Sequence, residues 1–588
     1  MHQVCYTDSI ERLYFLTRQL HIIDTLGPFF IDIPDRKTIN WSKVIFSDLE
    51  VNSRLSSSTQ KQIIANFELY IEKVSCLGYD SISIDDLAHL VIFPFYNQSL
   101  QALLTDYQNL YKQLFRIAKS HNMHIFVNTD YLFFNSDIKD YLSSHDVAPD
   151  DFYMQALEYA IKEFSEIDGV ILRVGEKDGK DVSGTFLSQL LLKTPAQANR
   201  LIKKILPLFE QHNKTLIFRT WTIGAYKIGD LIWNEKTYDA VFSSIKSDAL
   251  VISMKFGDTD FMRYLTLNPL FFRGSHKKII ELQTRREWEG MGTFPSFVGW
   301  DYSHYLEELS QNENIIGIHV WCQTGGWAKK AWTNLTYLEN SSFWNELNTE
   351  VTIDIARNHL TVEESIGRFC ERRLITNPER FIELLRYADV AIKKGLYISE
   401  LAEMQLYFRR TRIPPLMWLT WDNIHVPPMV VYLHRVLLPR NNRLLSEGDE
   451  AINATEKMIE IAHELQLNKK VLVSLEFEYA TMIILKELRR YIHKNPSQKE
   501  LTRINRQITT YKKDFPQHYS IPKLVPVKQR RLPHALLRPF LRESLSYRKR
   551  DKVFLKTSPV QARLVRYYLR LSKSRLENQS MGFEMFFK

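Results

Sequence analysis

The run GVILRVGE (169–176) shows the pattern on which the fold prediction rests. It is short enough for one strand, rich in β-branched residues and apolar on both faces, as a parallel sheet covered on both sides requires. Seven further runs share these properties, and stretches of helix length follow them: FFIDIPD (29–35), SISIDD (81–86), HIFVNTD (124–130), TLIFRTW (215–221), ALVISMKF (249–256), KIIELQT (278–284) and IIGIHVWC (315–322). Eight strand–helix units have one well-known closed arrangement. The sequence therefore predicts an α/β fold, a (β/α)8 TIM barrel whose site lies at the carboxyl ends of the strands.

The stretches between these runs have the apolar spacing of amphipathic helices, most clearly over 63–80, 99–123, 150–168 and 196–214. Gly78 stands where a glycine is expected to end the first of these helices. After residue 350 the pattern changes to long helices without strands. We therefore predict a barrel domain over 1–345 and an all-α helical domain over 346–500.

The net charge of +9 is distributed unevenly along the chain. Residues 501–588 contain 21 Lys and Arg against 5 Asp and Glu, so residues 1–500 carry a formal charge of −7. Several prolines in DFPQHYSIPKLVPVKQRRLP (514–533) accompany this change. We predict a third segment over 501–588, a basic helical tail.

Length and composition exclude several classes of protein. At 588 residues the chain is too long for one core, and its hydrophobic content of 45% is ordinary for a globular protein. It lacks an uncharged apolar stretch of about 18 residues, which a transmembrane helix requires, and its first residues do not have the pattern of a signal peptide. The four cysteines are scattered without metal-ligand spacing. We expect a cytoplasmic protein with reduced thiols, no metal and no cofactor.

Three acidic residues follow the fourth, sixth and seventh runs: Glu176, Asp260 and Glu287. Any one of them alone would be taken for a solvated loop acid, but together they place carboxylates around one barrel mouth. A glycosidase needs a carboxylic acid to protonate the leaving oxygen and a second carboxylate as nucleophile or as base for a water. We predict Glu176 as the general acid and the other two as the pair that holds the water.

Basic and aromatic residues also stand at or near the carboxyl ends of the predicted strands. Arg219 and Lys255 stand at strand ends that are otherwise apolar, where a buried charge needs a partner. Two interpretations stay open: an ion pair with Asp85, Asp86 or the catalytic acids, or a clamp for a substrate carboxylate such as that of a uronic acid. Indole faces near the strand ends can stack on sugar rings or simply pack. The predicted substrate-binding residues are Arg219, Lys255, Trp221, Asp86, Asn128, Trp300 and Trp327.

Residues 28–360 resemble the catalytic region of the family 67 α-glucuronidases. The similarity is carried by GPFFIDIPDR, GYDSISIDD, SHNMHIFVNTDYLFF, FSEIDGVILRVGEKDG, KFGDTD and IIELQTRREWEGMG. The resemblance implies that Glu176 is the general acid, that Asp260 and Glu287 are the catalytic carboxylates, and that Arg219 and Lys255 meet the uronate. It also implies inversion of configuration. The chain departs from the family at Arg286, which replaces a glutamine, and in HVWCQTGGWAKKAW (319–332), and with a barrel predicted to begin near residue 28 it lacks the family's N-terminal domain.

The expected function is therefore an inverting hydrolysis of a glycosidic bond in a uronic-acid-containing or other acidic glycan. Two alternatives stay open: a glycosidase of different specificity in polysaccharide assembly or turnover, and a non-catalytic carbohydrate-binding or scaffold protein. Residues 501–588 interleave Leu, Phe and Tyr with arginine, which is typical of helices that lie on an anionic membrane. The alternative is that this tail packs on the acidic globular part. It contains no recognisable nucleic-acid-binding module, so we expect no nucleic acid as a partner.

Overall fold

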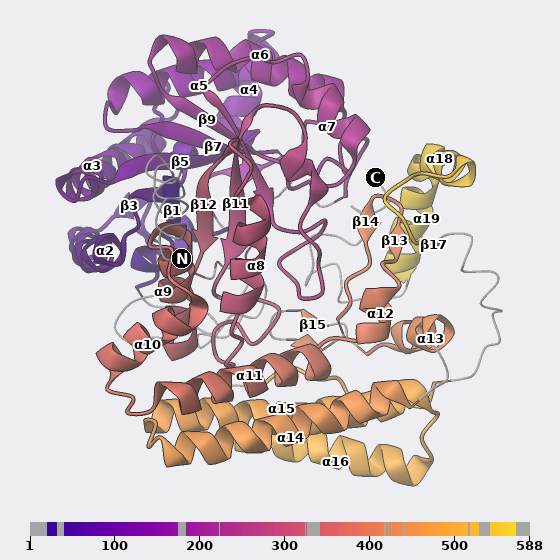
Figure 1. The fold of residues 1–588 in the computed structure, drawn as a ribbon. Helices are drawn as coiled ribbons and strands as arrows, with labels where there is room; N and C mark the ends of the chain where they lie inside the picture. Colours follow the sequence, from indigo (N-terminus) through magenta and orange to yellow (C-terminus); the bar gives the residue numbers. More distant parts are fainter. Residues whose placement is uncertain are drawn as a thin grey trace, which may run out of the picture.

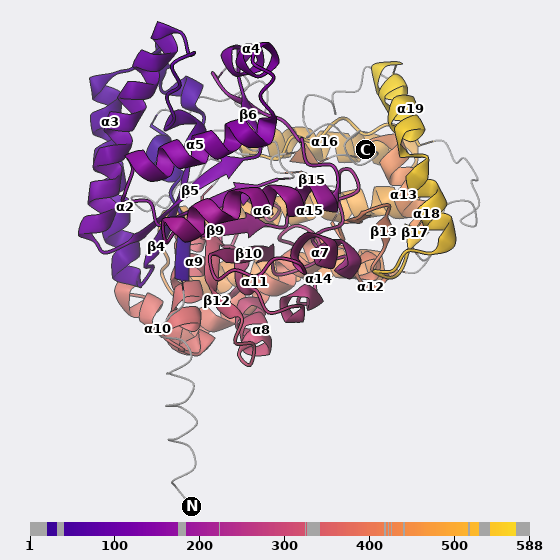
Figure 2. The ribbon, with the colours of Figure 1, turned by 90° about the horizontal axis from the view of Figure 1, so that it is seen from above.

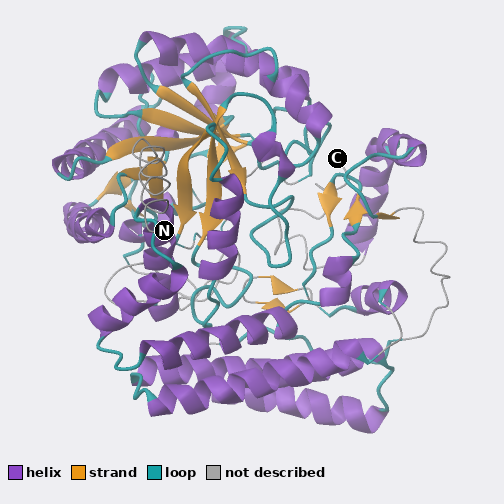
Figure 3. Ribbon diagram, viewed as in Figure 1, coloured by secondary structure: helices purple, strands orange, loops and turns teal. Residues whose placement is uncertain are grey.

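A computed structural model of the chain shows a barrel, a layer of long helices and a C-terminal segment that returns to the barrel (Figure 1 and Figure 3). No helix in the described part of the chain is both long and apolar enough to cross a membrane. The structure describes residues 20–31, 40, 42–174, 184–222, 224–323, 325, 342–416, 419–420, 423–424, 426–438, 442–515, 518–527 and 541–571.

Eight parallel strands close into a barrel, which confirms the predicted fold class. Their order around the barrel is β1-β12-β11-β10-β9-β7-β5-β4. The strands are β1 (Leu20–Asp24), β4 (Ser81–Asp85), β5 (His124–Asp130), β7 (Gly169–Arg173), β9 (Thr215–Arg219), β10 (Leu250–Lys255), β11 (Lys277–Gln283) and β12 (Ile315–Trp321). Seven of these coincide with predicted runs.

The first predicted strand, 29–35, is wrong. The barrel begins at β1, which pairs in parallel with β12 and β4. Gly27–Phe29 form instead a 3-10 helix, η1, with Pro28 in its first turn, and residues 32–39 lie outside the described part of the chain. The true strand carries a buried His21 whose ring Nδ1 lies 2.8 Å from Asp80 Oδ2. This polar residue pairs through Nδ1 with a residue 59 positions away, and the strand therefore does not have the pattern of an apolar run.

The predicted helices around the barrel are confirmed. They form an outer ring with α2 (Ser57–Leu77), α3 (Gln98–Ser120), α4 (Ser136–Ser144), α5 (Pro149–Glu163), α6 (Pro195–Gln211), α7 (Glu235–Phe242) and α8 (Gly299–Leu309) (Figure 2). Ser56 caps the start of α2 by accepting from the Thr59 backbone N–H, and Gly78 ends it with a φ of 111°, as expected of a C-terminal glycine. Local sequence signals therefore set these boundaries.

Long helices follow the barrel. The first, α9 (Phe343–Arg357), lies beside the barrel and packs against α8 and α2, and α10 (Val362–Arg373) packs against α9 and α11. The layer across the lower part of Figure 1 is formed by α11 (Pro378–Gly395), α14 (Arg443–Glu464), α15 (Lys469–His493) and α16 (Gln498–Asp514). The shorter α12 (Ser399–Glu403) and α13 (Pro428–Leu437) come between α11 and α14 in the sequence. The position predicted as a boundary, residue 500, falls inside α16, whose apolar face is buried.

Residues 541–571 return to the barrel side of the molecule. Strand β17 (Leu541–Arg542) pairs with β13 (Tyr407–Phe408), which also pairs with β14 (Thr411–Arg412). Helices α18 (Lys549–Lys556) and α19 (Ser558–Leu571) follow and form an outer edge of the molecule in both ribbon views (Figure 1 and Figure 2). This part of the predicted tail is anchored by backbone pairing.

The barrel interior changes character along the strands. One level is apolar and takes a side chain from each of six strands: Ile22, Phe126, Ile171, Ile217, Val251 and Ile279. Two residues further along each of these strands, on the same face, the side chain is polar and buried: Asp24, Asn128, Arg173, Arg219, Ser253 and Glu281. The described barrel therefore has an apolar floor beneath a ring of polar side chains at the carboxyl ends of its strands.

Candidate active site

Lys255, the last residue of β10, lies at the centre of a cluster of side chains at the barrel mouth. Lys255 Nζ lies 2.8 Å from Asp260 Oδ1 and 3.5 Å from the centre of the Trp221 ring. The Trp288 indole N–H donates to the other Asp260 oxygen, Oδ2, at 3.2 Å. Lys255 is buried, whereas Asp260 and Trp221 are partly exposed. The cluster thus joins the loops after β9, β10 and β11, as the sequence predicted for Lys255, Asp260 and Trp221.

A second carboxyl group, Glu287, stands in the loop after β11. Arg285 Nη2 lies 2.7 Å from Glu287 Oε2, and the Glu287 backbone N–H donates to Gln283 Oε1 at 2.9 Å. The Arg285 guanidinium also donates through Nη1 to the Gln323 carbonyl at 2.6 Å. Glu287 is therefore buried in a fixed orientation by groups at the ends of β11 and β12.

The pKa values of the two acids are displaced in opposite directions. Burial raises the pKa of Glu287; Arg285 opposes this shift and the charge of Asp260 adds to it. Burial would also raise the pKa of Asp260, but the charge and hydrogen bond of Lys255 hold that pKa below its ordinary value. One carboxyl group of this pair is thus favoured in its ionised form and the other in its acid form. Acid–base catalysis uses a pair of carboxyl groups with this difference.

Arg219 forms an ion pair with a residue that we did not predict. Its Nε and Nη2 lie 2.9 and 2.8 Å from the two oxygens of Glu281, and both side chains are buried. Ser253 Oγ and Trp321 Nε1 donate to the same carboxylate at 2.7 and 3.3 Å. Burial alone would raise the pKa of Glu281, but Arg219 holds it well below its ordinary range. Of the two interpretations left open for Arg219, the structure shows an ion pair, and contact with a uronate stays a prediction.

A further buried cluster joins β4, β5 and β7. Arg173 Nε donates to Asp130 Oδ1 at 2.8 Å, and its Nη1 donates to Asp85 Oδ2 at 2.9 Å. Asn128 Nδ2 donates to the other oxygen of Asp85 at 2.7 Å, while Asn128 Oδ1 is buried with no hydrogen-bond partner among the described residues. Asn128 therefore lies in the mouth as predicted, within a network that the sequence did not reveal.

The other predicted residues are placed differently. Asp86 caps the 3-10 helix η3 (Leu87–His89) and lies 2.6 Å from the His89 ring. The Trp300 indole N–H donates to Glu363 at 2.9 Å, and Arg386 stacks over its ring, so Trp300 packs against α10 and α11 and not in the cluster around Asp260. Glu176 and Trp327 lie outside the described residues.

Four functional candidates were missed from the sequence: Arg173, Glu281, Arg285 and Trp288. The first two do carry a sequence signal, because each is a charged residue two positions after an inward apolar residue of a predicted strand. Arg285 and Trp288 stand beside Glu287 in TRREWEG (284–290), where strand periodicity has ended and no pattern indicates which side chains face inward.

A buried network supports the two loops that carry the acids. Glu289 accepts from Arg286 Nε at 3.0 Å and from Arg263 Nε at 3.3 Å. Arg263 also donates to Asp389 of α11 at 3.0 Å, and the Tyr397 hydroxyl, just after α11, donates to Glu289. The helical layer therefore fixes the loops after β10 and β11. Arg286, a departure from the family 67 pattern, has a structural role here.

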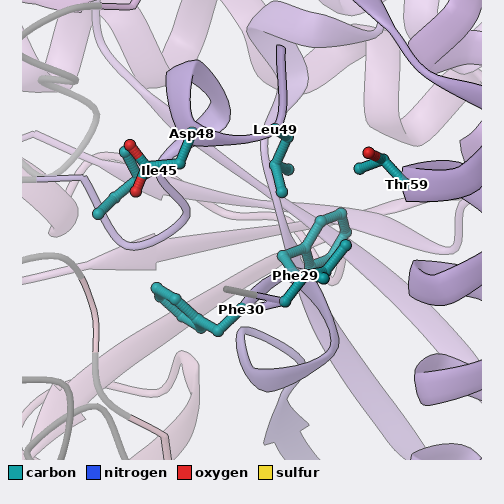
Figure 4. Close-up of a pocket in the computed structure, with 7 residues that line it drawn as sticks. Phe29, Phe30, Ile45, Asp48, Leu49 and Thr59 are labelled. Atoms are coloured by element: carbon teal, nitrogen blue, oxygen red, sulfur yellow. The ribbon is translucent and has the colours of Figure 1, made fainter. Parts of the chain in front are cut away.

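A small cavity lies apart from this cluster, beside η1. Its volume is about 100 Å³, and it is lined by Phe29, Phe30, Ile31, Ile45, Asp48, Leu49 and Thr59 (Figure 4). It contains neither acid of the pair and neither of the basic side chains that contact them. We therefore assign it no part in the chemistry.

No protein-family model and no curated protein matches the chain. Among solved structures, it is similar to a GH138 enzyme targeting the pectin rhamnogalacturonan II, with a TM-score of 0.47 and 12% identity over 85% of this chain and 62% of that one. It is also similar to CpGH84B, with a TM-score of 0.38 and 12% identity over 83% and 75% of the two chains. A GH5-4 broad specificity endoglucanase from Clostridium longisporum gives a TM-score of 0.32 and 10% identity over 59% and 98%.

The chain thus has distant structural similarity to glycoside hydrolases that share the barrel, and it spans less than two thirds of the length of the GH138 enzyme. These similarities assign it to no family. Any statement about its reaction has to be argued from the side chains at the barrel mouth.

Proposed function

We propose that the protein is a glycoside hydrolase that acts on a glycan carrying a uronic acid or another acidic sugar. The observation that carries the proposal is the pair formed by the partly exposed Asp260 and the buried Glu287, whose pKa values are displaced in opposite directions. The partly exposed Trp221 lies beside them, with Lys255 Nζ 3.5 Å from the centre of its ring. Paired carboxyl groups at the mouth of a barrel are what hydrolysis of a glycosidic bond requires.

In this proposal Asp260 accepts the proton of the attacking water. The ammonium group of Lys255 keeps it ionised, and Glu287 holds the same water. Glu176, which follows β7 in the sequence, protonates the leaving oxygen, as the resemblance to family 67 implies. An acid and a base on opposite faces of the sugar, with a water between base and sugar, give inversion of configuration.

The raised pKa of Glu287 favours a second assignment, in which Glu287 itself is the proton donor to the leaving oxygen. The two assignments differ in one measurable property. A variant that lacks the general acid keeps much of its rate on a substrate whose leaving group needs no protonation, whereas a variant that lacks the base does not. A nitrophenyl glycoside compared with an oligosaccharide therefore distinguishes Glu176→Gln from Glu287→Gln.

The cations beside the pair support an acidic substrate. Lys255 Nζ lies 2.8 Å from Asp260 Oδ1, and Arg285 Nη2 lies 2.7 Å from Glu287 Oε2, so two positive charges stand next to the proposed acids. Ammonium and guanidinium groups in such positions can also bind the carboxylate of an acidic sugar.

The test is to incubate the purified full chain with a panel of acidic and neutral oligosaccharides and to measure released sugars. We expect a free uronic acid, or another acidic sugar, from at least one acidic member. Release only of neutral sugars would leave a glycosidase of different specificity, and binding without release would indicate a carbohydrate-binding protein. Either result would overturn the proposal.

A further inference from the structure

Helices α18 and α19 expose an unusual number of large apolar side chains. Val553, Val560, Leu564 and Tyr567 are 63%, 59%, 63% and 65% exposed. They are four of the eight large apolar residues that are more than half exposed in the described part of the chain, and they fall within 15 consecutive residues. Single exposed apolar residues are ordinary, but a concentration of them marks an interaction surface.

These residues lie on two stripes with helical spacing. On α18 the exposed positions i, i+3, i+4 and i+7 are Lys549, Lys552, Val553 and Lys556. On α19 the same positions are Val560, Arg563, Leu564 and Tyr567. Side chains at this spacing share one face of a helix. Each stripe therefore combines cations with apolar side chains; we call the two together the α18–α19 face.

Other side chains of the same helices are used to hold them on the protein. Phe554 packs edge-on against Phe408 with ring centres 6.0 Å apart, and Asp551 is buried beside Arg548 with Oδ2 to Nε at 2.9 Å. The guanidinium of Arg542 lies 4.9 Å from the Trp233 ring, which joins the preceding strand to the loop after β9. The residues of the α18–α19 face take no part in these contacts and stay exposed. The two helices lie at the edge of the molecule (Figure 2).

The charge of this segment favours an anionic partner. Residues 541–571 contain nine Lys and Arg and two Asp and Glu. Arg542 is buried against Trp233, and Asp551 is buried in its ion pair with Arg548, which leaves seven cations and one acid outside these contacts. We propose that the α18–α19 face binds an anionic phospholipid surface. Lysine is depleted in protein–protein interfaces, whereas lysine and arginine beside aliphatic and aromatic side chains are typical of helices that lie in the headgroup region.

The experiment is co-sedimentation of the full chain with vesicles at low salt. One set contains phosphatidylcholine alone, and the other contains phosphatidylcholine with about a third phosphatidylglycerol. We expect binding at least tenfold tighter to the anionic vesicles and its loss when salt is raised, because exposed charges are screened. Leu564→Glu, which adds a negative charge to an exposed position of the face, should reduce binding by at least tenfold.

The matched control is Leu69→Glu on α2, where the apolar side chain is 52% exposed. Helix α2 lies on the opposite side of the molecule from α18 (Figure 1). This variant should bind as the unaltered protein does, and thermal unfolding should show that both variants are folded. Equal loss in the two variants, equal binding to both vesicle types, or no binding at low salt would overturn the proposal. Dissociation of an oligomer by Leu564→Glu without vesicle binding would assign the face to a second copy of the chain and would equally overturn it.

Discussion

Two charged clusters at the barrel mouth use the same kinds of side chain to different effect. In the cluster of β4, β5 and β7, one guanidinium, Arg173, is shared between the buried carboxylates Asp85 and Asp130. In the cluster of β10 and β11, two acids face two basic side chains, and the pKa of Asp260 is lowered while that of Glu287 is raised. Charge at the mouth of a barrel therefore does not by itself indicate an active site. The opposite displacement of the two pKa values distinguishes the cluster that we propose to be reactive from the cluster that we propose to be supporting.

The strongest expected effect is on turnover. Asp260→Asn removes the group that is proposed to accept the proton of water, and loss of a general base lowers turnover by about 10²–10⁴-fold. Asp85→Asn, an equally conservative change in the other cluster, should keep most of the turnover in the fraction that is folded. The measurement is the rate of sugar release at saturating substrate for both variants. Similar losses in the two would erase the distinction between the clusters.

The free energy of unfolding should depend much more on the buried ion pairs of Arg173 than on an exposed ion pair. Arg173→Met removes the guanidinium that Asp85 and Asp130 share, and breaking a buried pair in this way costs about 3–5 kcal/mol. Arg54→Met breaks the pair of Arg54 with Asp106, in which the arginine side chain is 60% exposed, and should cost at most about 1 kcal/mol. Urea unfolding of both variants measures the difference. A cost for Arg173→Met as small as that of the control would mean that the supporting cluster supports little.

The helical layer should matter for the reactive cluster through Tyr397. Tyr397→Phe removes the hydroxyl that donates to Glu289 and accepts from the Arg263 backbone N–H at 3.1 Å. A buried polar group left without its partner costs about 1–3 kcal/mol. We expect a lower urea midpoint together with a lower turnover number, because the loops after β10 and β11 lose a fixed contact. Reduced stability with unchanged turnover would show that the loops do not depend on this layer.

The smallest expected effect is a shift of the pH profile. Asp260 is proposed to act when ionised, so we expect activity to be lost as pH falls through the pKa of Asp260, which Lys255 holds low. Lys255→Met should therefore move the acidic limb of the profile to higher pH, because a neighbouring opposite charge is lost. In the second assignment, with Glu287 as the proton donor, activity should also be lost on the alkaline side, as pH rises through the raised pKa of Glu287. An acidic limb unmoved in Lys255→Met would separate this lysine from the chemistry.

The sequence predicts most of the fold because the signals are local. Seven strand positions follow from short apolar runs, and the end of α2 follows from Gly78. The first strand fails because LHIID (20–24) contains two buried polar residues, His21 and Asp24, whose partners Asp80 and Cys322 lie far along the chain, and the nearby FFIDIPD looks more apolar. A pattern within a window cannot include a partner 59 residues away.

The site is predictable in part for the same reason. Lys255 and Asp260 are five positions apart, so their contact follows from a strand end and one loop. Arg219 and Glu281 are 62 positions apart, and their pairing depends on how β9, β10 and β11 line up. The inward spacing shared by Arg173, Arg219 and Glu281 is visible only once the register of the strands is known.

The most direct test of the central claim is a time course of proton NMR spectra on an α-linked uronic acid oligosaccharide, with the unaltered protein and Asp260→Asn side by side. The proposal predicts that the unaltered protein releases the uronic acid first as its β-anomer, through inversion at the cleaved bond. It also predicts that Asp260→Asn, folded by thermal unfolding, releases almost none. Release at an equal rate by the Asp260→Asn variant, or none by the unaltered protein, would contradict the assignment of this cluster as the active site.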